Sequence, residues 1–330
     1  MSGWSEKRVL VTGAGGFIGS HLVELLVTEG ARVRALVHYN SRSDWANLDQ
    51  LPPQVREALE VVSGDVQDPF GVRRAVDGVE VVFHLAALIG IPYSYVAPQS
   101  YVSTNVLGTV NVLEAVRGEG VERLVHTSTS ENYGEIQYSP IDERHPLQGR
   151  SPYSASKIGA DQMAESYSRA FGTPVSILRP FNTYGPRQSM RAVIPTIAAQ
   201  ALSGTTVKLG SLNPIRDLTF VEDTARAFLA VAANETAGST LNAGSGKGIS
   251  IGELAGLVIE VAGSDAEVAG GVDERVRPDA SEVPELVCDS SRLRELTGWV
   301  PQVSLREGIE RTVQWVRENL AALKADFYNV

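Results

Sequence analysis

The stretch "RVLVTGAGGFIGSHLVELL", residues 8–26, constrains the fold of this chain more than any other. A short β-branched run at 9–11 leads into three glycines at G-x-x-G-x-x-G spacing, Gly13, Gly16 and Gly19. Apolar residues then recur at helical spacing. A strand, a glycine turn and a helix in this order predict the first unit of a dinucleotide-binding sheet.

Each glycine has its own expected role in such a unit. Gly13 permits the tight turn, Gly16 lets the backbone approach a pyrophosphate, and Gly19 allows the helix to pack closely on the strand. The start of the helix adds free N–H groups and partial positive charge for the anion. A glycine-rich turn without any ligand is the alternative.

Apolar strands alternate with helices along the first 180 residues. Strand patterns recur at 32–37, 59–66, 79–87, 121–129 and 174–182, and helical patterns at 69–78, 103–120 and 151–172. This alternation predicts an α/β fold with a doubly wound parallel sheet. After Pro180, prolines and glycines become frequent, which indicates a smaller mixed α/β lobe ending in an amphipathic helix at 306–320. We expect residues 1–180 plus about 217–242 to form the Rossmann domain, and about 181–216 plus 243–330 to form an interleaved substrate lobe.

The composition and charge of the chain exclude some classes of function. At 330 residues and a net charge of -10, the chain is large enough for a substantial core and too acidic for non-specific nucleic-acid binding. The single cysteine, Cys288, forms no internal disulfide and is expected to be a buried apolar residue. No metal site is predicted. We see neither a signal peptide nor about 18 uninterrupted apolar residues, so a soluble cytoplasmic protein is expected.

The end of the second strand bears on cofactor choice. An NAD site usually carries an acidic residue there, whereas this strand ends "ALVHYNSRS" with His38, Asn40, Ser41 and Arg42. Arg42 suits a 2′-phosphate, which favours NADP, with NAD as the alternative. An ordinary exposed arginine explains the residue equally well.

Tyr153 and Lys157 lie four residues apart in "YSASK", on one face of the long helix predicted at 151–172. A phenol beside an ammonium can transfer a proton, because the positive charge favours phenolate and lowers the tyrosine pKa. Thr129 offers a hydroxyl for the same substrate group. Most Y-x-x-x-K sequences are plain helix faces. The functional interpretation of this pair therefore depends on the glycine turn and the hydroxyl cluster that precede it in the chain.

Eight segments in order carry a family resemblance: "TGAGGFIG", "GDV", "HLAA", "NVLGTVNVLEA", "TSTSENYG", "YSASK", "RPFNTYGP" and "IRDLTFVED". The chain resembles the extended short-chain dehydrogenase/reductases of the nucleotide-sugar epimerase/dehydratase group. The resemblance implies that Asp65 contacts the adenine, that Leu85 to Ala87 line the cofactor, and that Asn105 props the neighbouring helix. The implied cofactor positions are Gly13, Gly16, Phe17, Ile18, Gly19, His38, Asn40, Ser41, Arg42, Asp65, Val66, Leu85, Ala86, Ala87, Asn105, Tyr153, Lys157 and Pro180.

The resemblance also implies a nucleotide-diphosphate sugar as substrate. Its diphosphate and nucleotide would be bound by Asn182, Arg216 and Arg277, since planar guanidinium groups suit phosphate oxygens. Ordinary surface ion pairs are the alternative for the arginines. The implied substrate positions are Tyr93, Asn182, Arg187, Val193, Arg216 and Arg277.

The run Thr129-Ser130-Glu131 favours dehydration within this group. It is similar to the Thr-Ser-Glu run of GDP-mannose 4,6-dehydratases, although nucleotide-glucuronate decarboxylases also carry a Ser-Glu pair. After Tyr153 has helped to oxidise C4, Glu131 can remove the acidified C5 proton, and Ser130 or a relayed water can protonate the departing C6 hydroxyl. Ser130 and Glu131 capping a turn is the alternative. Asn132 stands where the group has a small apolar residue.

The segment "IPYSY", 91–95, is similar to dehydratases that act on nucleotide-linked N-acetylglucosamine in legionaminic-type pathways. We expect a loop above the nicotinamide on which Tyr93 and Tyr95 shape the sugar pocket, or else pack together. The predicted function is an NDP-hexose 4,6-dehydratase, with a 4-epimerase, a decarboxylase or a non-catalytic dinucleotide sensor as alternatives. The resemblance further implies a homodimer in which helices 103–118 and 153–171 form a four-helix bundle.

Overall fold

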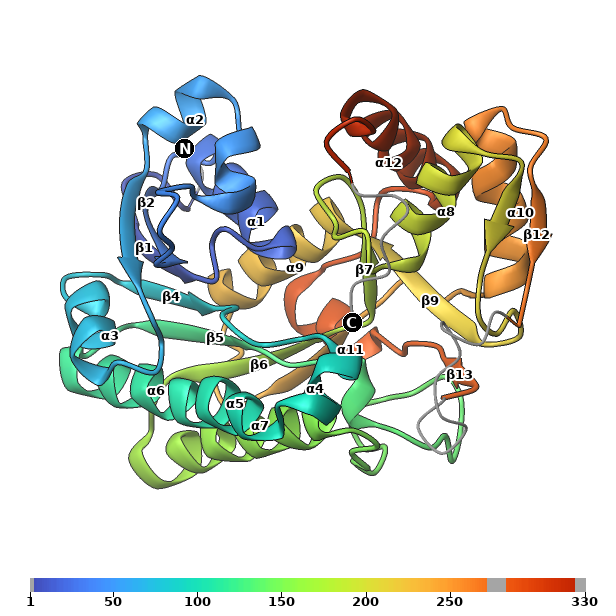
Figure 1. Cartoon of the computed structure of the whole chain (residues 1–330). Helices are drawn as coiled ribbons and strands as arrows, with labels where there is room; N and C mark the ends of the chain where they lie inside the picture. Colours follow the sequence, from blue (N-terminus) through green and yellow to red (C-terminus); the bar gives the residue numbers. More distant parts are fainter. Residues whose placement is uncertain (1–2, 272–282, 324–330) are drawn as a thin grey trace.

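A seven-stranded parallel sheet forms the centre of the larger lobe in the computed structural model, which describes residues 3–271 and 283–323 (Figure 1). The strands lie in the order β3-β2-β1-β4-β5-β6-β10. Their bounds are β1 Arg8–Thr12, β2 Arg32–His38, β3 Glu60–Gly64, β4 Val81–His84, β5 Arg123–Thr127, β6 Val175–Pro180 and β10 Thr240–Ala243. The order reverses beside β1, so a crevice is expected at the carboxyl ends of β1 and β4. The predicted doubly wound sheet is confirmed.

Helices cover both faces of this sheet, above and below it in Figure 1. Val9 and Val11 face one covering layer and Leu10 faces the other, and all three are fully buried. This two-sided burial explains why the strands are continuously apolar. The upper helices are α1 Phe17–Thr28 and α9 Val221–Ala233, and the lower helices are α3 Pro69–Val76, α6 Gly108–Glu119 and α7 Pro152–Phe171.

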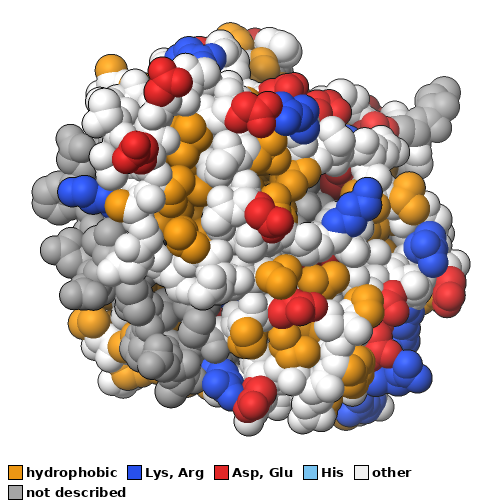
Figure 2. Space-filling view, turned by 90° about the vertical axis from the view of Figure 1, so that its right-hand side faces the viewer, with side chains coloured by type: hydrophobic (Ala, Val, Ile, Leu, Met, Phe, Trp, Pro, Cys, Tyr) orange, Lys and Arg blue, Asp and Glu red, His pale blue; other side chains and the backbone are white. Residues whose placement is uncertain are grey.

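The smaller lobe has its own sheet and core. Its four-stranded sheet contains β7 Asn182–Tyr184, β9 Ile215–Phe220, β11 Gly248–Ser250 and β13 Glu285–Leu286, while β8 Thr206–Lys208 pairs with β12 Glu267–Ala269. Helices α8 Val193–Ser203, α10 Ile251–Ala262 and α12 Leu305–Asn319 pack around a core that includes Ile197, Phe220, Val258 and Ile309. On the face of this lobe in Figure 2, charged side chains of both signs are interspersed with apolar ones.

The two lobes interleave along the chain. The predicted boundary at 217 falls inside β9, which belongs to the smaller lobe, whereas α9 and β10 return to the large sheet. Helix α11, Ser291–Thr297, also returns, because Leu293 and Trp299 lie in the core under α1 and α9. The described chain therefore crosses between lobes more often than the predicted boundaries state.

Short elements lie between the larger ones, most of them near the carboxyl edge of the large sheet. They are η1 Ala46–Gln50, α2 Pro53–Glu57, α4 Ile91–Val96, α5 Pro98–Tyr101, the π-helical η2 Val102–Leu107 and η3 Ser130–Asn132. The helix predicted at 103–120 thus continues an earlier turn and contains a π segment. None of the helices in the described ranges has the length and apolar character needed to cross a bilayer.

Candidate active site at the carboxyl edge of the sheet

The glycine turn after β1 leaves the start of α1 open. Gly13 has a φ of 69°, and a Cβ there would lie 2.7 Å from the Ala86 nitrogen. A Cβ at Gly19 would overlap the Gly13 carbonyl oxygen. Gly16 precedes α1 without a side-chain cap, and the first turn has no acidic residue. These features fit a pyrophosphate, since the helix N–H groups and positive end remain available to an anion.

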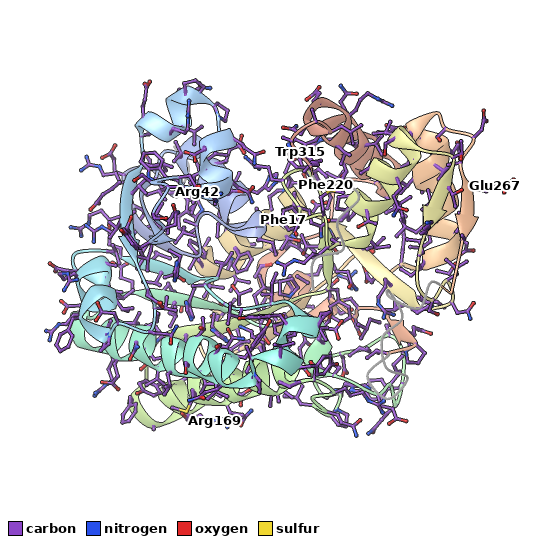
Figure 3. The ribbon with its side chains drawn as sticks, viewed as in Figure 1. Phe17, Arg42, Arg169, Phe220, Glu267 and Trp315 are labelled. Carbon is purple, nitrogen blue, oxygen red and sulfur yellow. The ribbon has the colours of Figure 1, made fainter. Side chains whose placement is uncertain are left out.

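The other positions predicted near the cofactor gather at the same edge. The backbone N–H groups of Leu85 and Ala86 each donate to Thr12 Oγ1 at 3.2 Å, which fixes the chain after β4 against the glycine turn. Phe17 and Ile18 pack against the core of the smaller lobe, toward Phe220 in Figure 3. Ala87 is half-buried, and Val66 and Pro180 are buried at the ends of β3 and β6.

The loop after β2 is exposed at the rim of the large lobe, where Arg42 lies in Figure 3. The Arg42 guanidinium is 81% exposed and pairs with Asp44 at 2.9 Å. Asn40 shapes the loop, accepting from the Arg42 backbone at 3.0 Å. His38 Nε2 lies 3.4 Å from Asp65 Oδ2, and Ser41 is exposed beside them. Arg42 therefore has a carboxylate partner in competition with any phosphate.

Helix α7 positions Tyr153 and Lys157 below the crevice. It begins with a capping box between Ser151 and Ser154, followed by Pro152 in the first turn. Tyr153 is 8% exposed and Lys157 is 4% exposed. Lys157 Nζ donates to the Thr127 carbonyl at 2.5 Å, and burial lowers the pKa of Lys157 to about 8.

Burial raises the pKa of Tyr153 above its usual value, and hydrogen bonding with the Thr129 side chain acts in the opposite direction. The predicted lowering of the Tyr153 pKa is therefore wrong for this arrangement. The physical reason is that desolvation of the phenolate outweighs the favourable contributions, while the Lys157 ammonium faces a backbone carbonyl.

The turn after β5 brings Glu131 toward the phenol. Thr129 Oγ1 accepts from the Glu131 backbone at 3.2 Å, so Thr129, rather than Ser130 or Glu131, caps η3. Ser130 is buried and Glu131 is half-buried. The charge of Glu131 contributes to the raised pKa of Tyr153. Thr129, Glu131 and Tyr153 thus interact at one point.

Asn105 ties three segments together around Tyr153. Its side chain accepts from the Leu88 nitrogen at 2.8 Å and donates to the Leu88 carbonyl and to Ser156 Oγ, both at 2.9 Å. It lies in the π segment η2, where its own carbonyl accepts from Thr109 Oγ1 at 2.6 Å. Such π segments often occur at functional sites.

The interpretation of residues 91–95 as a loop is wrong, because they lie in helix α4 with Pro92 in its first turn. Pro favours that position since its missing N–H has no partner there. Tyr93 is 41% exposed, and its ring lies 6.2 Å from that of Tyr101, which in turn lies 6.3 Å from the Tyr153 ring. This series of aromatic rings leads from the surface to the buried phenol of Tyr153.

A buried polar cluster below the site escaped the sequence interpretation. Asp161 Oδ2 accepts from Ser128 Oγ at 2.6 Å, Asn132 Nδ2 at 3.1 Å and Arg179 Nη2 at 2.9 Å. Burial disfavours the Asp161 carboxylate, but its neighbours His126, Arg179 and Ser128 lower the pKa of Asp161 to about 2. The spacing of Asp161, four residues after Lys157 and eight after Tyr153, is the signal that could have revealed it.

The predicted substrate residues lie on several separate elements. Asn182 and Arg216 lie on the paired strands β7 and β9, where Asn182 Nδ2 donates to the Asp217 carbonyl at 3.4 Å. Arg216 is 8% exposed and donates to the Ile215 carbonyl at 3.0 Å. Val193 begins α8, and Arg277 lies outside the described residues.

Arg187 belongs to a different surface from the one predicted. Its Nη2 lies 2.7 Å from Glu24 Oε2 and its Nε 3.2 Å from His21 Nε2, so the guanidinium is held against α1. It lines a groove of about 680 Å³ between α1, α9 and α12, whose lining residues do not include Tyr153 or Glu131. Arg187 has a φ of 67°, a left-handed backbone conformation that is uncommon for a residue other than glycine.

Known protein families and individual proteins are similar to this chain in sequence. The sequence profile of the GDP-mannose 4,6-dehydratase family matches residues 10–312. The chain is 35% identical to a dTDP-glucose 4,6-dehydratase of Streptomyces griseus, covering 94% of each chain. It is 34% identical to a UDP-glucose 4-epimerase of Mycolicibacterium smegmatis, covering 94% of this chain and 98% of the other.

A solved structure of similar shape is the dTDP-glucose 4,6-dehydratase DesIV of Streptomyces venezuelae, with NAD and TYD bound. It superposes with a TM-score of 0.85 at 32% identity, covering 96% of this chain and 99% of the other. Both dehydratases and epimerases are thus similar to this chain over nearly its whole length.

Proposed function

Because the chain belongs to the GDP-mannose 4,6-dehydratase family, we propose that it is an NDP-hexose 4,6-dehydratase that uses a nicotinamide cofactor. The proposed product is the 4-keto-6-deoxy sugar, and the favoured substrate is a nucleotide-linked N-acetylglucosamine or a similar hexose. One observation carries the proposal: the turn after β5 places the half-buried Glu131 two residues after Thr129, whose side chain hydrogen-bonds with the buried phenol of Tyr153. A base at that point is required for elimination but not for epimerisation.

In the first step, the substrate C4 hydroxyl gives its proton to the Tyr153 phenolate while it accepts a hydrogen bond from Thr129. A nicotinamide cofactor held by the glycine turn and the start of α1 would supply the hydride acceptor for C4 and the hydride donor for C6. The Lys157 ammonium, four residues beyond Tyr153 on α7, would favour the phenolate through its positive charge. Tyr153 and Lys157 thus perform the proton transfer that oxidation requires.

In the second step, the C4 ketone acidifies the C5 hydrogen and Glu131 removes it as a proton. Ser130 donates a proton to the C6 hydroxyl, which leaves as water. Glu131 then returns its proton to C5 as hydride reaches C6. The proton that Tyr153 gained replaces the one that Ser130 lost, so the cycle consumes no net proton.

A 4-epimerase is the second candidate, favoured by the epimerase relative at 34% identity. It would use Tyr153 and Lys157 and leave Glu131 idle. A nucleotide-glucuronate decarboxylase would require a uronate substrate and would release carbon dioxide.

We propose that the cofactor site accepts both NADP and NAD, with a small preference for NADP. Arg42 supplies a guanidinium near the expected 2′ position, but its exposed pair with Asp44 reduces the charge that a 2′-phosphate would meet. Asp65 beside His38 adds a further acidic group at this end of the site.

We also propose a homodimer. Val102 and Leu107 on η2 are 51% and 54% exposed, and Phe171 at the end of α7 is 57% exposed. Large apolar side chains exposed along neighbouring helices are typical of a surface that a second subunit covers. The helices that carry them are those expected to form the four-helix bundle.

A panel of UDP-, GDP- and dTDP-hexoses, with either NAD or NADP, tests the proposed reaction. Mass spectrometry should reveal loss of water from one sugar, and in deuterated water the product should carry deuterium at C5. Epimerisation would change the sugar without loss of water or exchange at C5. If every sugar loses neither water nor its C5 hydrogen, the protein is not a dehydratase for this panel.

A further inference from the structure

Asn132 lies at the end of the turn that carries Ser130 and Glu131, and the structure shows what its side chain contacts. Asn132 is fully buried. Its Nδ2 donates to Ser128 Oγ and to Asp161 Oδ2, both at 3.1 Å. Its backbone carbonyl accepts from the Gln148 nitrogen at 2.8 Å. An apolar side chain at this position would make neither of the two hydrogen bonds that Nδ2 donates.

The partner of Asn132 is well fixed. Asp161 is fully buried on α7, two helical turns beyond Tyr153 and one beyond Lys157. Arg179 on β6 donates to its Oδ2 through Nε at 3.2 Å and Nη2 at 2.9 Å, and is itself 2% exposed. Because both side chains come from regular elements of the large lobe, helix α7 and strand β6, Asp161 is a rigid anchor for the groups that bond to it.

The turn that carries Ser130 and Glu131 has little rigidity of its own. It is a 3-10 helix of three residues, held at its start by the Thr129 cap. Short 3-10 segments have poor hydrogen-bond geometry and depend on outside contacts. Asn132 closes the turn at its end, and its amide joins that end to the helix bearing Tyr153 and Lys157.

We propose that Asn132 is a positioning residue that, through Asp161, fixes Ser130 and Glu131 relative to Tyr153. The inference rests on the proposed dehydratase function. It assigns Asn132 to the elimination step, since Tyr153 and Lys157, which carry C4 oxidation, are held by α7 without Asn132. Thr129, which also contacts the C4 hydroxyl, lies at the start of the turn, and Asn132 fixes the other end. Loss of the amide should therefore slow removal of the C5 proton far more than hydride transfer from C4.

The test uses Asn132→Leu, which has nearly the same size but no amide. Wild type and variant are mixed with UDP-N-acetylglucosamine, dTDP-glucose or GDP-mannose in deuterated water. The absorbance of bound reduced nicotinamide reports C4 oxidation, and deuterium at C5 reports proton removal. We expect C5 exchange to fall by about tenfold to a hundredfold, the effect of misplacing a catalytic group by about 1 Å. Reduced cofactor should accumulate, because oxidation continues while elimination lags.

Ser176→Ala is the matched control. Ser176 is 2% exposed and bonds Thr236 at 2.8 Å, but it lies near the amino end of β6, away from the site. This variant should lose similar stability and retain both steps. Should Asn132→Leu fail to fold, Asn132→Ala removes the same amide without adding bulk, and the same accumulation is expected.

Equal loss of both steps, or unchanged C5 exchange, in a folded Asn132→Leu protein would overturn the positioning role. Failure of the proposed function is seen separately, as absence of C5 exchange with every sugar in the wild-type protein. The two failures are therefore distinguishable within one experiment.

Discussion

Replacing Lys157 by methionine should change how the stability of the cofactor-free protein depends on pH. Burial lowers the pKa of Lys157 from 10.5 to about 8, and the side chain is 4% exposed. The unfolded chain keeps this proton up to about pH 10.5, whereas the folded chain releases it above about pH 8. Between these values the unfolded state binds more protons, so the free energy of unfolding of the wild type rises with pH.

The size of this effect follows from the two pKa values. A pKa difference of one unit corresponds to about 1.4 kcal/mol, and most of the difference between 10.5 and about 8 is realised by pH 10. Wild type should therefore gain about 2–3 kcal/mol relative to Lys157→Met between pH 7 and pH 10. Methionine has a similar length and carries no proton, so ionisations shared by the two proteins cancel in the comparison.

Denaturant unfolding of both proteins at pH 7, 8, 9 and 10, without cofactor or sugar, provides the measurement. The variant should be catalytically inactive throughout. Parallel pH profiles for the two proteins would refute the reasoning, because they would mean that Lys157 has the same pKa in both states. A wild type that loses stability relative to the variant would reverse the sign and refute it more directly.

Three further results are expected. Glu131→Gln should reduce C5 exchange by about 100-fold or more while reduced cofactor still forms, and persistent exchange would place the base elsewhere. Arg42→Ala should weaken NADP binding by less than about fivefold in a fluorescence titration and leave NAD binding unchanged, since an exposed pair contributes about 0–1 kcal/mol. Leu107→Glu should shift sedimentation at micromolar protein toward monomer; a wild type that already sediments as monomer would end the dimer proposal.

The large sheet could be predicted because its signals are local. Gly13, with its positive φ, and Gly19, packed on the Gly13 carbonyl, have physical requirements visible in the spacing of the glycines. Strands such as Val9–Val11 are apolar throughout because helices cover both of their faces. The order of these segments then fixes the crevice at the carboxyl ends.

What the sequence did not reveal depends on contacts between distant segments. Helix α4 is only six residues long, too short for a periodic pattern, although Pro92 in its first turn agrees with a helix start. The course of Arg187 toward Glu24 joins residues 163 positions apart. Arg179 and Asp161 meet only because β6 and α7 pack together. Each of these outcomes is decided by tertiary structure.

Burying the Asp161–Arg179 ion pair costs free energy, and this cost suggests that the pair does more than stabilise the fold. Removing two charges from water is expensive, and a buried ion pair often contributes no more stability than apolar residues of the same volume would. Apolar groups, however, pack without preferred direction, whereas the donors to Asp161 of α7 come from β6 and from the segment after β5, each along a defined line. Charge at this position therefore fixes orientation, and the element whose orientation most needs fixing is the three-residue turn that carries Glu131. In the proposed dehydratase, that constraint serves the elimination step, in which Glu131 must reach C5.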